Sequence, residues 1–196
     1  YRHPLADDFI KGAIGYGIPL NEDYNGAIQE GISYTQRTIF KGRRVSSARA
    51  FLRPALKRSN IELRTKSHAT KIVFDGKRAV GIQYSRGGQS YEIRARREII
   101  LSGGAVNSPQ LLQLSGVGPA ALLREIGVPV HHDLLGVGEN LRDHFVLRIV
   151  ARIKTMDTIN QRVKGLPLVS ETFKYFTGRP SVLGLSPTLV YIFWKS

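Results

Sequence analysis

The sequence has no cysteine, and it has only one methionine and one tryptophan. The lack of cysteine excludes disulfides, thiolate metal sites and cysteine nucleophiles. No apolar run approaches the roughly 20 residues of a membrane-spanning helix, and the apolar run at residues 189–194 is short and aromatic, as in a strand. Neither a Walker A loop nor a G-x-S-x-G turn occurs, so the motifs of P-loop nucleotide hydrolysis and of α/β-hydrolases are missing.

Acidic residues are scarce relative to basic ones. The chain has 29 lysines and arginines against 15 aspartates and glutamates, which gives a formal net charge of +14. Such an excess raises the question of a nucleic-acid partner. The basic clusters at residues 43–44, 57–58 and 94–97 are short, however, and aromatic side chains do not interleave with them. We therefore expect a solvated basic surface and no nucleic-acid partner.

The N-terminal part is rich in turn-forming residues. Apolar spacing predicts a short helix over residues 5–12, and alternation predicts a strand over 31–40. A second helix is expected to begin at Ser46 and to end near residue 59, with either a kink or a restart at Pro54.

Three alternating segments follow at residues 70–74, 80–85 and 91–95. Asp75-Gly76 separates the first two, and residues 86–88, which end in Gly-Gly, separate the second from the third. Both dipeptides are strong hairpin signals, so we expect a three-stranded antiparallel meander.

A continuous apolar run at residues 99–101 predicts a central strand of a parallel sheet, beside a strand at 61–64. Ser108-Pro109 is expected to open the next helix, and Pro119 a further helix that ends at Gly127. Beyond that point the pattern predicts a strand over 145–153, a helix over 170–176, a turn over 178–180 and a final strand.

Two candidate sites are rejected on physical grounds. Residues 116–121 match G-x-G-x-x-A by letter, but a helical segment precedes them and Pro119 removes one N–H from the would-be phosphate cradle. A metal site is suggested by a group of potential ligands, but the two adjacent histidines point to opposite sides of an extended chain. We expect no metal site at these residues, which are His131, His132, Asp133, Asp143 and His144.

The most specific block is Gly104-Ala-x-x-Ser108-Pro109-x-Leu111-Leu112-x-x-Ser115-Gly116-Val117-Gly118. It resembles the second signature of the glucose–methanol–choline (GMC) oxidoreductases, flavoproteins that oxidise alcohols, and the style is most similar to their choline dehydrogenase-like members. Further blocks occur in the order that the family shows, at residues 23–26, 42–47, 60–63, 79–82, 95–101 and 136–144.

The resemblance implies an α/β (mixed α+β) fold: a partial FAD-binding Rossmann-like sheet with the meander, plus part of a substrate-binding domain. Residues 1–45 would belong to the substrate-binding domain, 46–143 to the FAD-binding domain and 144–196 to a second substrate-domain segment. The family's N-terminal GxGxxG unit and C-terminal catalytic histidine have no counterpart here. We therefore expect the middle of a longer enzyme.

The same resemblance assigns cofactor contacts. It implies that the backbone amide and carbonyl of Ala69 meet the FAD adenine, and that a turn passes close to the dinucleotide. That turn is formed by Ser102, Gly103, Gly104 and Ala105. The resemblance assigns no catalytic residue to this segment, and we interpret Asn140, Asp143 and His144 as structural.

The implied function is that of a fragment of an FAD-dependent alcohol oxidoreductase, which converts a primary alcohol to an aldehyde by hydride transfer to FAD. The fragment alone is expected to be inactive, to bind FAD poorly and to self-associate through an exposed sheet edge. A cytoplasmic, bacterial-type location is expected. The alternative is a non-enzymatic binding module that uses the basic surface; salt-dependent binding would favour it, and the scattered charge argues against it.

Overall fold

The computed structural model describes residues 2–154, 156–185 and 188–195. The chain forms two compact units: unit 1 comprises Tyr1–Ile61 and Ile149–Ser196, and unit 2 comprises Glu62–Arg148. Unit 1 therefore joins the two ends of the chain, and unit 2 is one continuous segment. The assignment of substrate-binding and FAD-binding roles along the chain stays a prediction.

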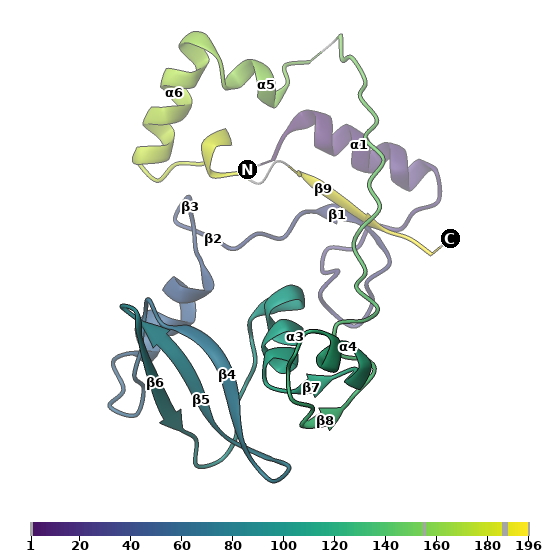
Figure 1. Ribbon diagram of the computed structural model, residues 1–196. Coiled ribbons are helices and arrows are strands. Elements are labelled where there is room, and N and C mark those ends of the chain that lie inside the picture. The colour runs from purple at the N-terminus through teal and green to yellow at the C-terminus, as the bar shows by residue number, and fades with distance from the viewer. Residues whose placement is uncertain (1, 155, 186–187, 196) are drawn as a thin grey trace. The chain divides into compact units, whose positions relative to one another are not determined.

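Unit 1 is built on a pair of antiparallel strands, β1 (Gly31–Tyr34) and β9 (Val190–Phe193), which come from opposite ends of the chain. Helix α1 (Pro4–Gly15) lies beside β1 (Figure 1). The Tyr34 hydroxyl fixes this packing by donating to Asp7 Oδ1 at 2.9 Å. The expected N-terminal helix and final strand are confirmed. The strand expected over 31–40 is confirmed only at its start, because β1 ends at Tyr34 and residues 39–40 belong to a separate hairpin.

The helix expected between Ser46 and residue 59 is confirmed in part: it is helical over 48–55, restarts at Arg53 beside Pro54, and ends earlier than expected. A short hairpin, β2 (Ile39–Phe40) and β3 (Arg43–Arg44), leads into a π-helix, η1 (Ala48–Leu52), and then into the three-residue α2 (Arg53–Ala55). Proline has no N–H to donate to the carbonyl four residues back, so an α-helical ladder cannot run through Pro54. The Arg53 N–H bonds to Ala48, five residues back.

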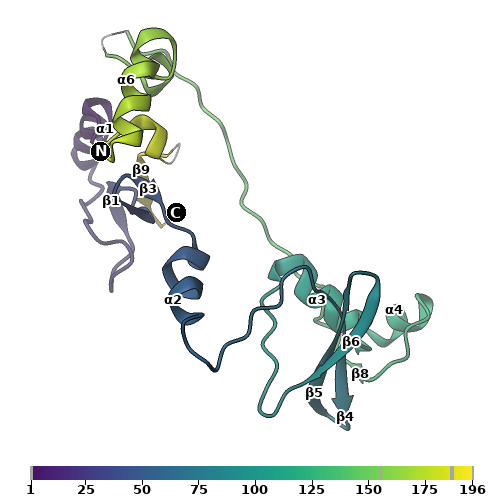
Figure 2. The ribbon, with the colours of Figure 1, turned by 90° about the vertical axis from the view of Figure 1, so that its left-hand side faces the viewer.

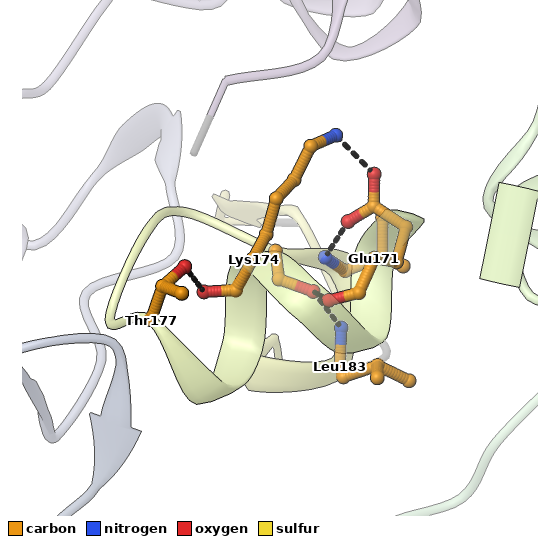
Figure 3. Close-up of polar contacts among 6 residues, drawn as sticks. Glu171, Lys174, Thr177 and Leu183 are labelled. Carbon is orange, nitrogen blue, oxygen red and sulfur yellow. Dashed lines mark hydrogen bonds and ion pairs between the residues drawn. The ribbon is translucent and has the colours of Figure 1, made fainter. Parts of the chain in front are cut away.

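The C-terminal half of unit 1 is organised around a buried carboxylate on α6 (Gly165–Phe176). Glu171 accepts the Val182 N–H at 2.9 Å and the Lys174 ammonium at 2.8 Å (Figure 3). Val182 begins the short 3-10 helix η2 (Val182–Gly184), so the carboxylate ties two elements together. Burial alone would raise the pKa of Glu171, but the hydrogen bonds from Lys174 and from the Val182 backbone outweigh it, and the pKa is lowered.

Helix α6 confirms the expected helix over 170–176 and begins earlier, at Gly165. It is preceded by α5 (Ile159–Arg162), whose N-cap Thr158 forms a capping box with Gln161. The turn after α6 is also confirmed: Gly178 has φ +73, a conformation that glycine adopts without strain.

Unit 2 contains the expected meander: β4 (His68–Asp75), β5 (Arg78–Arg86) and β6 (Gln89–Arg94), paired antiparallel in that order (Figure 2). The β5–β6 turn consists of two residues with positive φ, Gly87 at 60° and Gly88 at 81°. Two-residue hairpins need this geometry, and only glycine adopts it twice in succession without strain. The meander is confirmed.

Helix α3 (Gly104–Leu114) lies against β4 (Figure 1), and the side chain of Ser115 joins the two. The Ser115 Oγ accepts the Ile72 N–H at 2.8 Å within the core, so an edge backbone donor of β4 is satisfied by a side chain.

A small β-α-β element follows α3. Its strands, β7 (Val117–Gly118) and β8 (His132–Asp133), are parallel, and α4 (Ala120–Glu125) connects them. The side chain of Leu123 on α4 is fully buried. Gly127 ends the helix as expected, with φ +73 and the Val128 N–H bonded to the Leu123 carbonyl.

Three expected strands are wrong. Residues 61–64 and 99–101 lie outside strands, so the parallel layer expected between them is not formed within the described part of unit 2. Arg64 instead bonds with its side chain to Glu62 and Tyr84. Residues 145–153 are also irregular and mostly exposed, because no strand of the described chain pairs with them. A β pattern forms a strand only where a partner supplies the hydrogen bonds.

The mixed α/β class, with its antiparallel three-stranded sheet, is nevertheless confirmed. Among the helices that the structure describes, none combines the length and the apolar character needed to cross a membrane.

Candidate functional site

One pocket of about 390 Å³ in unit 2 brings together residues that the sequence assigns to the cofactor. Ala69 comes from β4, and Ser102 and Gly103 come from the extended segment that leads into α3. Gly104 and Ala105 form the first turn of α3, next to the lining but not part of it. Three of the five predicted residues therefore surround the same space, although more than 30 residues separate Ala69 from Ser102.

The pocket has apolar walls and a few polar side chains, the usual composition of a small-molecule site. The apolar side chains come from β5, the extended segment and α3, and those of Ile82 and Leu111 lie on two different elements. The polar lining residues are His68, Ser102, Asn107, Ser108 and Gln110. A pocket of this composition suits a flat heteroaromatic ring. The apolar side chains would contact the faces of the ring, and the polar groups would form hydrogen bonds to its edge.

Strand β4 forms the edge of the sheet, because β5 alone pairs with it among the described strands. The pairing is irregular at this end: Ala69 lies opposite Tyr84 and Lys71 opposite Gln83, which leaves Thr70 as an extra residue. An edge strand presents N–H and C=O groups that a ligand can bind. The backbone around Ala69 is therefore placed where a ring with donor and acceptor groups could extend the sheet.

Helix α3 begins five residues earlier than the sequence predicts, with Gly104 as its first residue instead of Pro109. Ser108 lies inside the helix, and its Oγ accepts the Gly103 N–H at 3.0 Å. Gly104 has φ +85, so this glycine allows the chain to turn from the extended segment into the helix. Pro109 consequently lies within the helix, where it removes one backbone hydrogen bond.

The rejected alternatives have structural roles in unit 2. The Asp133 carboxylate accepts the Ala120 N–H at 2.9 Å, so the first turn of α4 bonds to a protein carboxylate. The His131 ring stacks on Phe74 with 4.4 Å between ring centroids. Within the described ranges, no three metal-ligating side chains converge.

A polar cluster that the sequence did not predict lies at the start of unit 2 and consists of Glu62, Arg64 and Tyr84. The Arg64 guanidinium donates to Glu62 Oε1 at 2.7 Å and to the Tyr84 hydroxyl at 2.6 Å. The hydrogen bond from Arg64 lowers the pKa of Glu62. Tyr84 lies on β5 opposite Ala69, so this cluster holds the segment before β4 to the sheet. The one sequence feature that indicates this cluster is the spacing of Glu62 and Arg64, which places both side chains on the same side of an extended segment.

Comparison with known proteins identifies the family. A family model described as GMC oxidoreductase matches residues 1–146. The chain is 41% identical to human mitochondrial choline dehydrogenase over 180 residues, which cover 90% of this chain and 30% of that protein. It is 50% identical to the oxygen-dependent choline dehydrogenase of Pseudomonas fluorescens over 149 residues, 74% of this chain and 26% of that protein.

Solved structures agree with this result. An FAD-dependent oxidoreductase from Chaetomium thermophilum matches 97% of this chain with a TM-score of 0.81 and 25% identity, over 34% of its own length. Formate oxidase from Aspergillus oryzae matches 95% of this chain with a TM-score of 0.80 and 26% identity, over 33% of its length. The chain belongs to the GMC oxidoreductase family, and it spans 26–30% of the length of the choline dehydrogenases compared here.

Proposed function

We propose that this chain is part of an FAD-dependent alcohol oxidoreductase of the choline dehydrogenase kind, which oxidises a primary alcohol to an aldehyde. This oxidation would transfer the hydride from the alcohol carbon to FAD and the hydroxyl proton to a general base of the enzyme. The identity to choline dehydrogenases over most of this chain supports the substrate class. Family membership favours this function over a non-enzymatic binding module.

One observation supports the proposal that unit 2 binds FAD. Ala69, Ser102 and Gly103, chosen from the sequence as cofactor residues, line one pocket beside an edge strand. In the proposal, the backbone at Ala69 binds the adenine, and the turn at Ser102 and Gly103 lies along the dinucleotide. The apolar walls exclude water from the ring. No residue of this chain is assigned a catalytic role, and a cytoplasmic location stays a prediction.

The adenine contact can be tested by replacing Ala69 with proline in the full-length protein. Proline removes the one N–H proposed to bind the adenine, and an edge strand tolerates proline where that N–H faces away from the sheet. We expect FAD affinity to fall about tenfold. The measurement is titration of the apoprotein with FAD, followed by flavin fluorescence, with circular dichroism to check the sheet.

Ala69→Ser is the matched control, because it changes the side chain and keeps the N–H; its FAD affinity should equal that of the wild type. Unchanged affinity in Ala69→Pro would contradict the adenine contact. Loss of the sheet in Ala69→Pro would place the N–H inside the ladder and would contradict it as well. Independently of both, a full-length protein that does not oxidise choline or another primary alcohol would overturn the proposed activity.

We further propose that the isolated chain is inactive and self-associates. Strand β6 is exposed along its whole length at the second edge of the meander, and Ile100 is 77% exposed beside the pocket. Unpaired edges and exposed apolar side chains promote pairing between chains. Static light scattering should show a mass that rises with concentration. A constant monomer mass up to high protein concentration would refute this expectation.

A further inference from the structure

A second pocket, of about 400 Å³, lies within unit 1 and has a pronounced positive charge. The described residues that line it include two arginines, Arg2 and Arg37, and no carboxylate. Arg2 precedes α1, and Arg37 follows β1, so two elements that pack on each other bring both residues to the lining of one pocket. This pocket is distinct from the one that contains Ala69, which lies in unit 2.

Two polar atoms at this pocket are buried without a hydrogen-bond partner in the described structure: Thr35 Oγ1 and Arg37 Nε. The one hydrogen bond of the Arg37 side chain there is a long one, from Nη2 to the Thr188 carbonyl at 3.4 Å. A buried donor without an acceptor is costly, and such atoms are rare in folded proteins. Arg37 Nη1 has no hydrogen-bond partner among the described residues either, so the guanidinium keeps donors for a ligand that brings acceptors.

The positive charge is not neutralised within the described ranges, where neither Arg2 nor Arg37 forms an ion pair. Burial lowers the pKa of Arg37, as expected for a cation that is removed from water without a counter-ion. The Arg2 guanidinium lies 5.3 Å from the centroid of the Tyr34 ring. The Tyr34 hydroxyl already donates to Asp7, so that carboxylate has a partner of its own.

Part of the remaining lining is apolar. Ile39, Pro180 and Leu185 provide apolar surface. Backbone segments meet at Gly42 and Gly184, where a Cβ on Gly184 would lie only 2.8 Å from the Gly42 carbonyl oxygen. Two lining residues are therefore held together by close backbone packing.

We propose that this pocket of unit 1 binds a small organic carboxylate. Arg2 and Arg37 would pair with the carboxylate, since the planar guanidinium fork matches its geometry. The Thr35 hydroxyl would donate to one of its oxygens, and the apolar side chains would contact a short hydrocarbon tail. Inorganic phosphate would leave that apolar surface without a contact, so an organic anion fits better. This inference does not depend on the proposed FAD site.

The test is titration of the full-length protein with sodium butyrate, followed by isothermal calorimetry. We expect saturable binding. Arg2→Gln and Arg37→Gln should each weaken butyrate binding about tenfold, because each removes a charge-assisted hydrogen bond. Arg2 is exposed and precedes the first helix, so Arg2→Gln is expected to keep the fold. If Arg37→Gln unfolds, butyrate binding by Arg2→Gln alone tests the proposal.

Arg53→Gln is the matched control: it makes the same charge change at an exposed position of unit 1 outside the pocket, and butyrate binding should not change. Butyramide, which has the same shape without the charge, should not bind. The proposal is overturned by absence of butyrate binding, by equal loss in Arg2→Gln and Arg53→Gln, by equal binding of butyramide, or by phosphate binding in place of butyrate.

Discussion

Gly116→Ala is expected to destabilise unit 2 by about 3 kcal/mol, the sum of a positive-φ penalty and a steric clash. Gly116 has φ +85, and a Cβ there would lie 2.5 Å from the Pro129 carbonyl oxygen and 3.0 Å from the His131 N. Both neighbours are backbone atoms, so neither can rotate away. The backbone has to shift, and with it the contact between β7 and β8. Urea unfolding followed by circular dichroism measures the loss.

Gly104→Ala is a closely matched control. Gly104 has the same φ of +85, but no atom lies within 4 Å of the Cβ position. This variant isolates the conformational penalty, which is about 1–2 kcal/mol. The difference between the two variants is the cost of the close approach at Gly116. Equal destabilisation of the two would show that the approach of Pro129 to Gly116 is absent in solution.

Glu171→Ala is expected to destabilise unit 1 by about 3 kcal/mol, because a buried charge-assisted network loses its acceptor. The Val182 N–H would lose its partner in the interior, and Lys174 would lose its ion pair (Figure 3). The single tryptophan, Trp194, lies in unit 1, so its fluorescence during urea unfolding reports on this unit. Glu22→Ala, at an exposed position of the same unit, should have little effect.

The same carboxylate should make unit 1 acid-sensitive. The pKa of Glu171 is lowered in the folded state, so its stabilisation is fully present above the unfolded pKa of about 4.3. It is lost as the pH falls through the lower folded value. Wild-type unit 1 should therefore lose more stability than Glu171→Gln between pH 5 and pH 3, measured by urea unfolding at each pH. Parallel acid profiles for the two proteins would contradict this role of Glu171.

Elements that depend on residues close together in the sequence could be predicted from the sequence alone. The meander follows from side-chain alternation and from glycine pairs at its turns, and Gly87 and Gly88 have the positive φ that the turn requires. Helix α4 and its glycine terminator follow from the same kind of local rule. A family signature leads to the backbone side of the cofactor pocket but not to its polar side chains, such as Asn107 and Gln110. Asn107 lies in the first turns of α3, which begin before the predicted helix, and the helical pattern alone does not show that Gln110 faces the pocket.

The sequence by itself determined the family, the meander and the glycine-dependent turns, because these depend on residue identity over short distances. Only the tertiary structure decided that β1 pairs with β9, and that residues 99–101 line a pocket without joining a sheet. It also decided that Arg2 and Arg37 share one space in unit 1. The physical reason is that a strand, a buried charge and a pocket each need partners from distant parts of the chain, and the local sequence does not specify those partners.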